Sequence, residues 1–175
     1  RVVPVGAACV PAPLCVAAPA HPLTASSLTS LAAILRRLDR LAEAELAALA
    51  GLAIRQEAYG FRNPTTASSL EALAAIRADR GDAKSARDLL EKAVAIRTRS
   101  STAAHPRTAD AIEQLANLEP RDNAEPIAVA RELAPLLERA LRIRATALGE
   151  DHPKTDAISR LLADTLRKAG DEAKA

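Results

Sequence analysis

The chain has 175 residues, 24 of them basic and 22 acidic, so its formal net charge is only +2. Such a balance provides no general attraction to nucleic acid or to a membrane surface, and no uncharged apolar run that is free of proline approaches the roughly 18 residues of a membrane-spanning helix. Apolar residues make up 49% of the sequence but aromatic residues only 1%, so the core must consist of Leu, Ile, Val and Ala. Because Ala, Leu, Arg and Glu favour helices and no stretch alternates with a period of two, the composition predicts an all-α fold.

Residues 1–20 are apolar but interrupted by four prolines, which predicts a disordered leader or a linker within a longer polypeptide. Cys9 and Cys15 lie in this segment, and we expect both to be free thiols. The alternative is a metal site with His21, although the spacing matches no usual zinc motif. The expected location is cytoplasmic, with a secreted form as the alternative if this segment is the remnant of a signal peptide.

The rest of the sequence repeats itself. Residues 24–28, TASSL, recur as residues 66–70 after a shift of 42. A His-Pro or Asn-Pro pair opens each unit, with spacings of 42, 42 and 47. Self-similarity at such a period is typical of a stacked array, in which each unit buries its apolar face against its neighbours. The array is predicted over residues 21–175, with repeats 21–62, 63–104 and 105–151 and a partial repeat 152–175.

The first repeat is predicted to contain two helices. His21 is expected to cap the first helix, which Pro22 starts. Apolar residues then recur at intervals of three and four and draw one stripe, made of Leu28, Leu31, Ile34, Leu35 and Leu38. The second helix is expected from about residue 41 to 58, with an inward face of Leu46, Leu49, Leu52 and Ile54. Because Asp39 stands in the turn where the second repeat has Gly81, one unbroken helix is the alternative.

The second repeat has the clearest helix signals. Asn63 can cap through its side-chain oxygen, Pro64 follows at the first helical position, and the helix should continue to about Asp79. Gly81 supplies the left-handed residue that ends a helix, and Asp82 caps the next one. The inner face of that second helix is expected to be Ala86, Leu89, Leu90, Ala93, Val94 and Ile96.

The third repeat departs from this pattern after its first apolar positions. Five additional residues are inserted, Pro120 should end the first helix early, and Pro126 is placed to start a new one. Pro135 lies where that helix should be under way, so we expect either a kink or a helix that really starts at Pro135. Gly149 is expected to end it.

The fourth repeat is predicted to supply one more first helix, with Ile158, Leu162 and Leu166 on its apolar side. A turn at Gly170 follows, and the last residues would begin a second helix. Polar residues such as Arg167 and Lys168 favour a terminal cap.

With these helix pairs in place, the sequence resembles the tetratricopeptide repeat, in particular the long form found in kinesin light chains. Residues 140–155, ALRIRATALGEDHPKT, match the consensus A-L-x-I-R-x-x-x-L-G-x-x-H-P-x-T of that form. Gly81, Ala86 and Ala93 fall on its turn glycine and its two small packing positions. The resemblance implies a right-handed superhelical array of antiparallel helix pairs, whose concave groove is lined by the first helix of each repeat.

The resemblance also implies which side chains line that groove, because the family presents fixed positions of each first helix to it. The polar residues so placed that we expect to bind a partner are Arg36, Arg37, Asp79, Gln114, Asn117, Arg160, Asp164 and Arg167. Amides carry a donor and an acceptor and suit a peptide backbone, whereas arginines suit acidic groups. The alternative for each residue is an ordinary solvated position.

No active site is recognisable in the sequence. The three histidines all precede prolines at equivalent repeat positions, which predicts helix caps. No serine or cysteine has a partner base at a plausible separation, and no glycine-rich phosphate loop is present, so we expect no cofactor and no metal. Arg80, Gly81 and Asp82 spell an adhesion tripeptide, but they also form the turn that the second repeat requires.

We therefore expect a non-catalytic scaffold that binds a peptide or a protein surface in its groove, with no nucleic-acid and no membrane partner. One alternative is a regulatory segment of a larger enzyme such as a bacterial serine/threonine kinase, since such kinases often carry similar repeats. A third is nucleic-acid binding, which a flat response of affinity to salt would count against; its candidate residues are Arg36, Arg37, Arg160, Arg167 and Lys168. The identity of the partner and the oligomeric state stay open.

Overall fold

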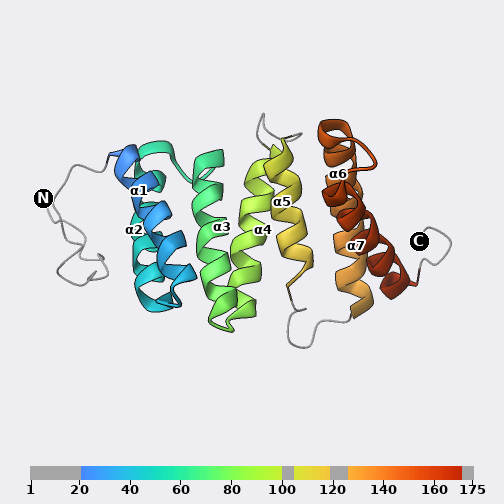
Figure 1. Ribbon diagram of the computed structural model, residues 1–175, viewed down its shortest axis with the longest axis horizontal. Coiled ribbons are helices and arrows are strands. Elements are labelled where there is room, and N and C mark those ends of the chain that lie inside the picture. Colours follow the sequence, from blue (N-terminus) through green and yellow to red (C-terminus); the bar gives the residue numbers. More distant parts are fainter. Residues whose placement is uncertain (1–20, 100–104, 119–125, 171–175) are drawn as a thin grey trace, which may run out of the picture.

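A computed structural model describes residues 21–99, 105–118 and 126–170 of the chain. Within these ranges the backbone forms α-helices and no strand, and Figure 1 shows the helices following one another along the long axis. The expected leader, residues 1–20, lies outside the described ranges. The helices are α1 (Pro22–Arg37), α2 (Leu41–Tyr59), α3 (Pro64–Asp79), α4 (Ala83–Arg99), α5 (Pro106–Ala116), α6 (Pro126–Leu148) and α7 (Pro153–Ala169).

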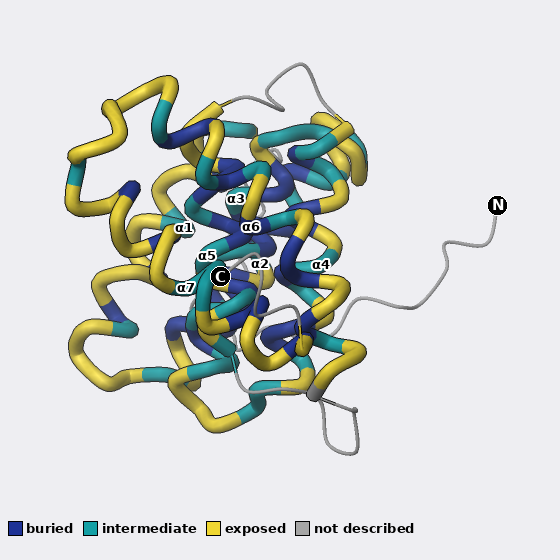
Figure 2. The backbone as a smooth tube through the Cα atoms, turned by 90° about the vertical axis from the view of Figure 1, so that its right-hand side faces the viewer, coloured by how far each residue is buried: buried dark blue, intermediate teal, exposed yellow. Residues whose placement is uncertain are grey.

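The helices pack mainly against their neighbours in sequence. The first helix pair is α1 with α2, the second is α3 with α4, and the third is α5 with α6. The second helix of each pair also packs against the helix that follows it in sequence. Helix α1 also contacts α3, so the first helices of these two pairs lie side by side. Seen along the array in Figure 2, buried backbone lies inside and exposed backbone outside. The described part of the chain is therefore a stack of helix pairs in which each pair is buried by the next.

The first helix of each unit begins in the same way. Proline occupies the first turn, and the preceding side chain accepts a hydrogen bond from the backbone N–H two residues later. This confirms the prediction that the histidines are caps. The acceptor atoms and their distances to that nitrogen are Nδ1 of His21 (3.2 Å), Oδ1 of Asn63 (2.9 Å), Nδ1 of His105 (3.1 Å) and Nδ1 of His152 (3.1 Å).

The turns inside the first and second pairs have the same geometry. Gly81 has a φ of +81°, and Asp39 takes the equivalent left-handed position with a φ of +58°. In the first turn the N–H of Arg40 donates to the carbonyl of Leu35 at 2.9 Å, and an equivalent bond of 2.9 Å closes the second turn. Aspartate is one of the few residues besides glycine that visit this conformation. The first repeat is therefore a hairpin, and the alternative of one unbroken helix is wrong.

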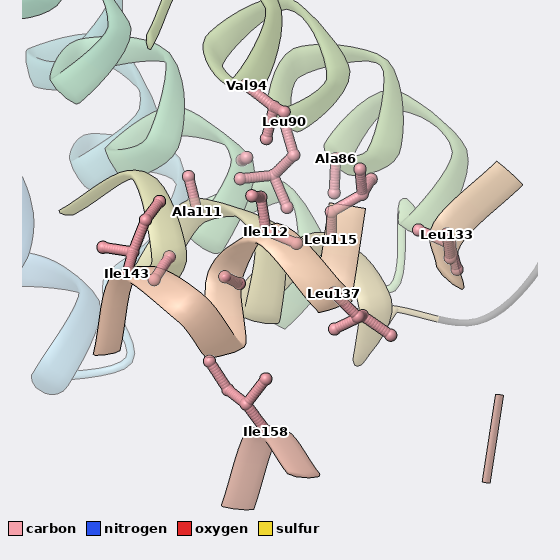
Figure 3. Packing of buried hydrophobic residues seen from close by; sticks show 13 residues of the cluster. Ala86, Leu90, Val94, Ala111, Ile112, Leu115, Leu133, Leu137, Ile143 and Ile158 are labelled. Atoms are coloured by element: carbon pink, nitrogen blue, oxygen red, sulfur yellow. The ribbon is translucent and has the colours of Figure 1, made fainter. Parts of the chain in front are cut away.

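Two apolar clusters hold the array together. One joins the first pair to α3 and includes Leu35, Leu52, Leu70 and Leu73. The other runs from Ala74 of α3 to α7, and Figure 3 shows several of its residues packed together. The inner face predicted for α4 is confirmed, with four residues buried and Leu89 and Ile96 half-buried. The fully buried isoleucines and leucine of the second cluster are Ile112, Leu137 and Ile158.

The apolar stripe predicted for α1 is largely on the surface. Leu31, Ile34 and Leu38 are 40%, 56% and 61% exposed. At the matching positions of α3, Leu73 and Ile76 are buried because α2 packs against that side of the helix. No described helix occupies the equivalent place beside α1. Of the predicted stripe, Leu35 is buried, together with Ala25 and Ala32.

The inward face predicted for α2 also needs a correction. Leu52 is buried, but Leu49 is 40% exposed. Small residues make much of the buried side, namely Ala44, Ala47, Ala48 and Gly51. A methyl group at Gly51 would lie 3.1 Å from the carbonyl oxygen of Ala25, so the absence of a side chain permits this close approach of α2 to α1.

The third pair differs from the first two as its prolines indicate. Helix α5 is short, and α6 starts at Pro126 as expected and continues through Pro135. The alternative in which the helix starts at Pro135 is therefore wrong. Pro135 lies on the exposed side of α6, where water can reach the carbonyl that its missing N–H leaves unpaired. Gly149 and Gly170 end α6 and α7 with φ values of +94° and +79°, whereas Pro120 and the expected helix after Gly170 lie outside the described ranges.

Candidate functional site

An open cleft of about 670 Å³ crosses the first helices of the three pairs. It exists because α1, α3 and α5 present equivalent faces to the same side of the array. Its lining includes five of the predicted site residues, which are far apart in sequence, and their role in binding stays a prediction. These residues are Arg36 and Arg37 at the end of α1, Asp79 at the end of α3, Gln114 on α5, and Asn117 directly after α5.

Small apolar side chains line the cleft between its polar residues. Alanine occupies positions 33, 72, 75 and 78, so no large side chain fills the hollow between α1 and α3. A surface of this kind leaves room for an extended segment, while the polar residues around it provide hydrogen-bond partners.

Charges in the cleft are not balanced. Arg36 lies 3.6 Å from Asp79, an exposed and weak ion pair. The other carboxylate in the lining, Glu71, is paired with the buried Arg97 of α4. Among the described residues, no ion pair engages Arg37 or Arg107, which line the same cleft. The cleft therefore carries an excess of positive charge that attracts acidic groups.

The two side-chain amides of the cleft are available to a partner. Gln114 and Asn117 are exposed, and neither side chain has a hydrogen bond to another described residue. An amide with an unused donor and acceptor can bind the N–H and C=O groups of an extended backbone.

The remaining three predicted site residues lie elsewhere. Arg160, Asp164 and Arg167 are exposed on α7, and none of them lines the cleft. Asp164 and Arg167 form an ion pair with an N–O distance of 2.7 Å, and Arg160 forms one with Asp156 at 2.6 Å. These are local ion pairs along one helix, which stabilise it by a few tenths of a kcal/mol. Their role in binding stays a prediction.

Each pair also contains a buried arginine that the sequence analysis did not single out. Arg55, Arg97 and Arg144 occupy equivalent positions of α2, α4 and α6 and are only 9%, 3% and 3% exposed. Arg107 was missed as well, because it lies at the second position of α5 and has no charged counterpart in the earlier repeats. The signal that could have identified the first two arginines is their recurrence, since Arg55 falls on Arg97 after a shift of 42.

Sites of other kinds are not found in the described part of the chain. No group of His, Cys, Asp and Glu side chains there is placed to hold a metal ion. His21 is engaged as a cap, and Cys9 and Cys15 lie outside the described ranges, so the metal alternative has no support from His21. None of the described helices combines the length and the apolar character needed to cross a membrane.

Comparison with known proteins gives a consistent result. Residues 24–65, 66–107 and 134–154 match the tetratricopeptide repeat family. Two similar solved structures are kinesin-light-chain TPR-like repeats from Podosopora anserina; each match covers 90% of this chain and 72% of the other. They are 24% and 25% identical to this chain, with TM-scores of 0.69 and 0.67. No curated protein matches the sequence. The predicted all-α, right-handed array of antiparallel helix pairs is confirmed.

Proposed function

This chain belongs to the tetratricopeptide repeat family, whose members are generally protein-interaction modules, and we propose that it binds a peptide segment of another protein in the cleft across α1, α3 and α5. The observation that carries the proposal is the convergence of side chains from three helix pairs on one open cleft. A long surface of this kind suits an extended chain better than a small compact ligand.

Binding in this cleft requires no chemistry from the protein. The polar groups around it are guanidinium, amide and carboxylate groups of Arg36, Arg37, Gln114, Asn117 and Asp79. They can donate to and accept from a backbone, while the alanines between them contact apolar side chains. We propose that the chain acts as a non-catalytic scaffold whose specificity comes from the spacing of these groups.

The experiment is a selection of random displayed peptides on the purified chain, followed by measurement of Kd by fluorescence anisotropy. The cleft variant carries Arg36→Glu and Arg37→Glu. The matched control carries Arg131→Glu and Arg142→Glu, which reverses the same number of charges at exposed positions of α6 outside the cleft. We expect the cleft variant to weaken binding by about tenfold or more and the control to stay within about twofold of the original chain.

Two results would contradict this function. One is the absence of any selected peptide that binds the folded chain. The other is an equal loss in the cleft variant and in the α6 control variant, which would place the binding surface elsewhere or reduce the effect to net charge. Circular dichroism of both variants establishes that each is folded.

A further inference from the structure

The three buried arginines, Arg55, Arg97 and Arg144, are equivalent in sequence but not in surroundings. Arg97 of α4 reaches back to α3, where it pairs with Glu71 through two nitrogens and donates to Oγ of Ser68 at 2.9 Å. Arg144 of α6 reaches back to α5, where it pairs with both Asp110 and Glu113 at 2.6 Å. In both pairs, therefore, a carboxylate from the first helix compensates the buried charge, as a buried guanidinium requires.

The first pair lacks this carboxylate. A shift of 42 places Ser26 on Ser68 and Asp110, and Thr29 on Glu71 and Glu113, so both acidic positions are hydroxyl residues in α1. Arg55 donates to Oγ1 of Thr29 at 3.0 Å, to Oγ of Ser26 at 3.3 Å and to Oγ of Ser69. These hydroxyls satisfy donors but carry no charge.

Arg55 is consequently a buried cation without a counter-ion among the described residues. No described carboxylate lies within ion-pairing distance of it, and its Nε–H has no described acceptor, whereas the Nε–H of Arg97 donates to Glu71. Burial lowers the pKa of Arg55, and proximity to Tyr59 opposes this only in part. Since a guanidinium stays protonated in proteins, the charge persists and an anion from outside is stabilised beside it.

The position of Thr29 connects this charge to the cleft. Thr29 lines the cleft, as does Glu71 at the matching position of the next pair. A threonine side chain is shorter than a glutamate side chain and carries no charge, so no carboxylate takes beside Arg55 the place that Glu71 takes beside Arg97. Arg55 itself does not line the cleft, and Thr29 lies between it and the cleft together with Arg36 and Arg37 of the same helix, which also line it.

We propose that Arg55 is the anion-binding subsite of the cleft, and that it takes a carboxylate supplied by the bound peptide in place of the acidic residue that α1 lacks. The inference rests on the proposed function, because the carboxylate arrives with a peptide in the cleft. According to this inference, the partner is a peptide segment that carries an acidic group, and the acid binds on the α1 side of the cleft. The carboxylate belongs either to an Asp or Glu side chain or to a peptide C-terminus.

The test uses peptides selected from a random displayed library on the full chain. We expect the selected peptides to be enriched in acidic residues or to require a free C-terminus. Replacement of the essential acid by its amide, or amidation of the C-terminus, identifies the source of the carboxylate. Each neutralisation that removes the carboxylate is expected to weaken binding by about 10- to 100-fold, the effect of a hydrogen-bonded charge.

Substitution of Thr29 provides the decisive comparison. Thr29→Glu gives the first pair the carboxylate that Glu71 gives the second, so it should weaken the acidic peptide by a similar factor and make its neutral version bind equally well. Thr29→Gln adds nearly the same volume without charge and should keep the preference for the acid. A thermal melt of Thr29→Glu should show no loss of stability, because the new carboxylate pairs with Arg55.

The possible failures are distinguishable. If no peptide binds in the cleft, the proposed function itself fails. If peptides bind in the cleft but show no preference for a carboxylate, or if Thr29→Glu leaves that preference intact, the subsite at Arg55 is refuted. Equal losses in Thr29→Glu and Thr29→Gln would also refute it, because they would reflect bulk and not charge.

Discussion

The first and second helix pairs share most of their apolar pattern, yet the same positions have opposite environments. Leu31 and Ile34 on α1 are 40% and 56% exposed, whereas Leu73 and Ile76 on α3 are 3% and 1% exposed. The difference lies in α2, which covers α3 but has no described counterpart beside α1. In a stacked array the burial of a side chain is therefore a property of the neighbouring repeat as much as of its own.

The two pairs also use different residues to form the turn between their helices. Asp39 and Gly81 hold the same left-handed position, and Arg40 and Asp82 both precede a second helix. Only Asp82 caps its helix through the side chain, accepting a hydrogen bond from the N–H of Ser85 at 3.1 Å. The first pair is thus built from less favourable local choices, and its stability depends more on packing.

The largest difference between the pairs is expected for core truncation. Leu73→Ala should lower the free energy of unfolding by about 2 to 5 kcal/mol, because it leaves a cavity between α2 and α3. Leu31→Ala, at the equivalent exposed position, should cost less than about 1 kcal/mol. Urea unfolding followed by circular dichroism measures both values, and equal costs would mean that α1 is covered in solution.

Substitutions in the two turns should change the stability of the chain in opposite directions. Gly81→Ala places a methyl group on a residue with φ of +81° and should cost about 1 to 2 kcal/mol. Asp39→Gly relieves the same conformation in the first turn and should stabilise the chain by less than about 1 kcal/mol. Thermal melts of the two single variants provide the comparison. A loss of stability in Asp39→Gly would show that the aspartate makes a contact that offsets its backbone conformation.

Much of the local structure could be predicted from the sequence, because it depends on neighbours along the chain. The bounds of α3 follow from Asn63, Pro64 and Gly81, and those signals are sufficient without knowledge of the packing. The exposure of Leu31 was not predictable in this way, since periodicity identifies an apolar face but not what lies against it. Pro135 was misjudged in part, because the local rule favours a break where α6 continues.

The candidate site was predictable to a similar extent. Cleft residues such as Arg36 and Gln114 follow from the repeat register, which fixes the face of each first helix. Arg55 was visible in the sequence as a recurring arginine, but its missing counter-ion emerges only when Thr29 is set against Glu71. That comparison requires knowledge of which helix the arginine reaches.

The helix caps should show a smaller difference between the pairs. Asn63→Ala removes the acceptor at the start of α3 and should cost about 1 kcal/mol. His21→Ala removes the equivalent acceptor at the start of α1, where the helix end lies at the edge of the array and the cost is smaller because such ends open locally. Hydrogen exchange of the first-turn amides distinguishes the two. A larger cost at His21 would mean that this end of α1 is held more tightly than its surroundings indicate.

The smallest difference between the two pairs should appear in the pH dependence of unfolding at low pH. Hydrogen bonds from the side chain and backbone of Ser85, together with Arg77, lower the pKa of Asp82 below its ordinary value of 3.8. A carboxylate whose pKa is lower in the folded state stabilises the protein above its unfolded pKa and loses that contribution as the pH falls through the folded value. Acid unfolding of Asp82→Asn should therefore depend less on pH below about 3.8. An acid limb that is the same in Asp82→Asn and in the original chain would contradict this role of Asp82.

The two ends of the described array are chemically unlike. The outer side of α1 is apolar, whereas the exposed positions of α7 are mostly charged or polar. Of the two described ends, the α1 end is the one that exposes an apolar surface on which a further repeat could pack. A duplicate of residues 63–104 spliced ahead of residue 21 would place its second helix on Leu31 and Ile34 and raise the melting temperature, while the same duplicate attached behind α7 would meet mostly charged and polar side chains and stabilise the chain less.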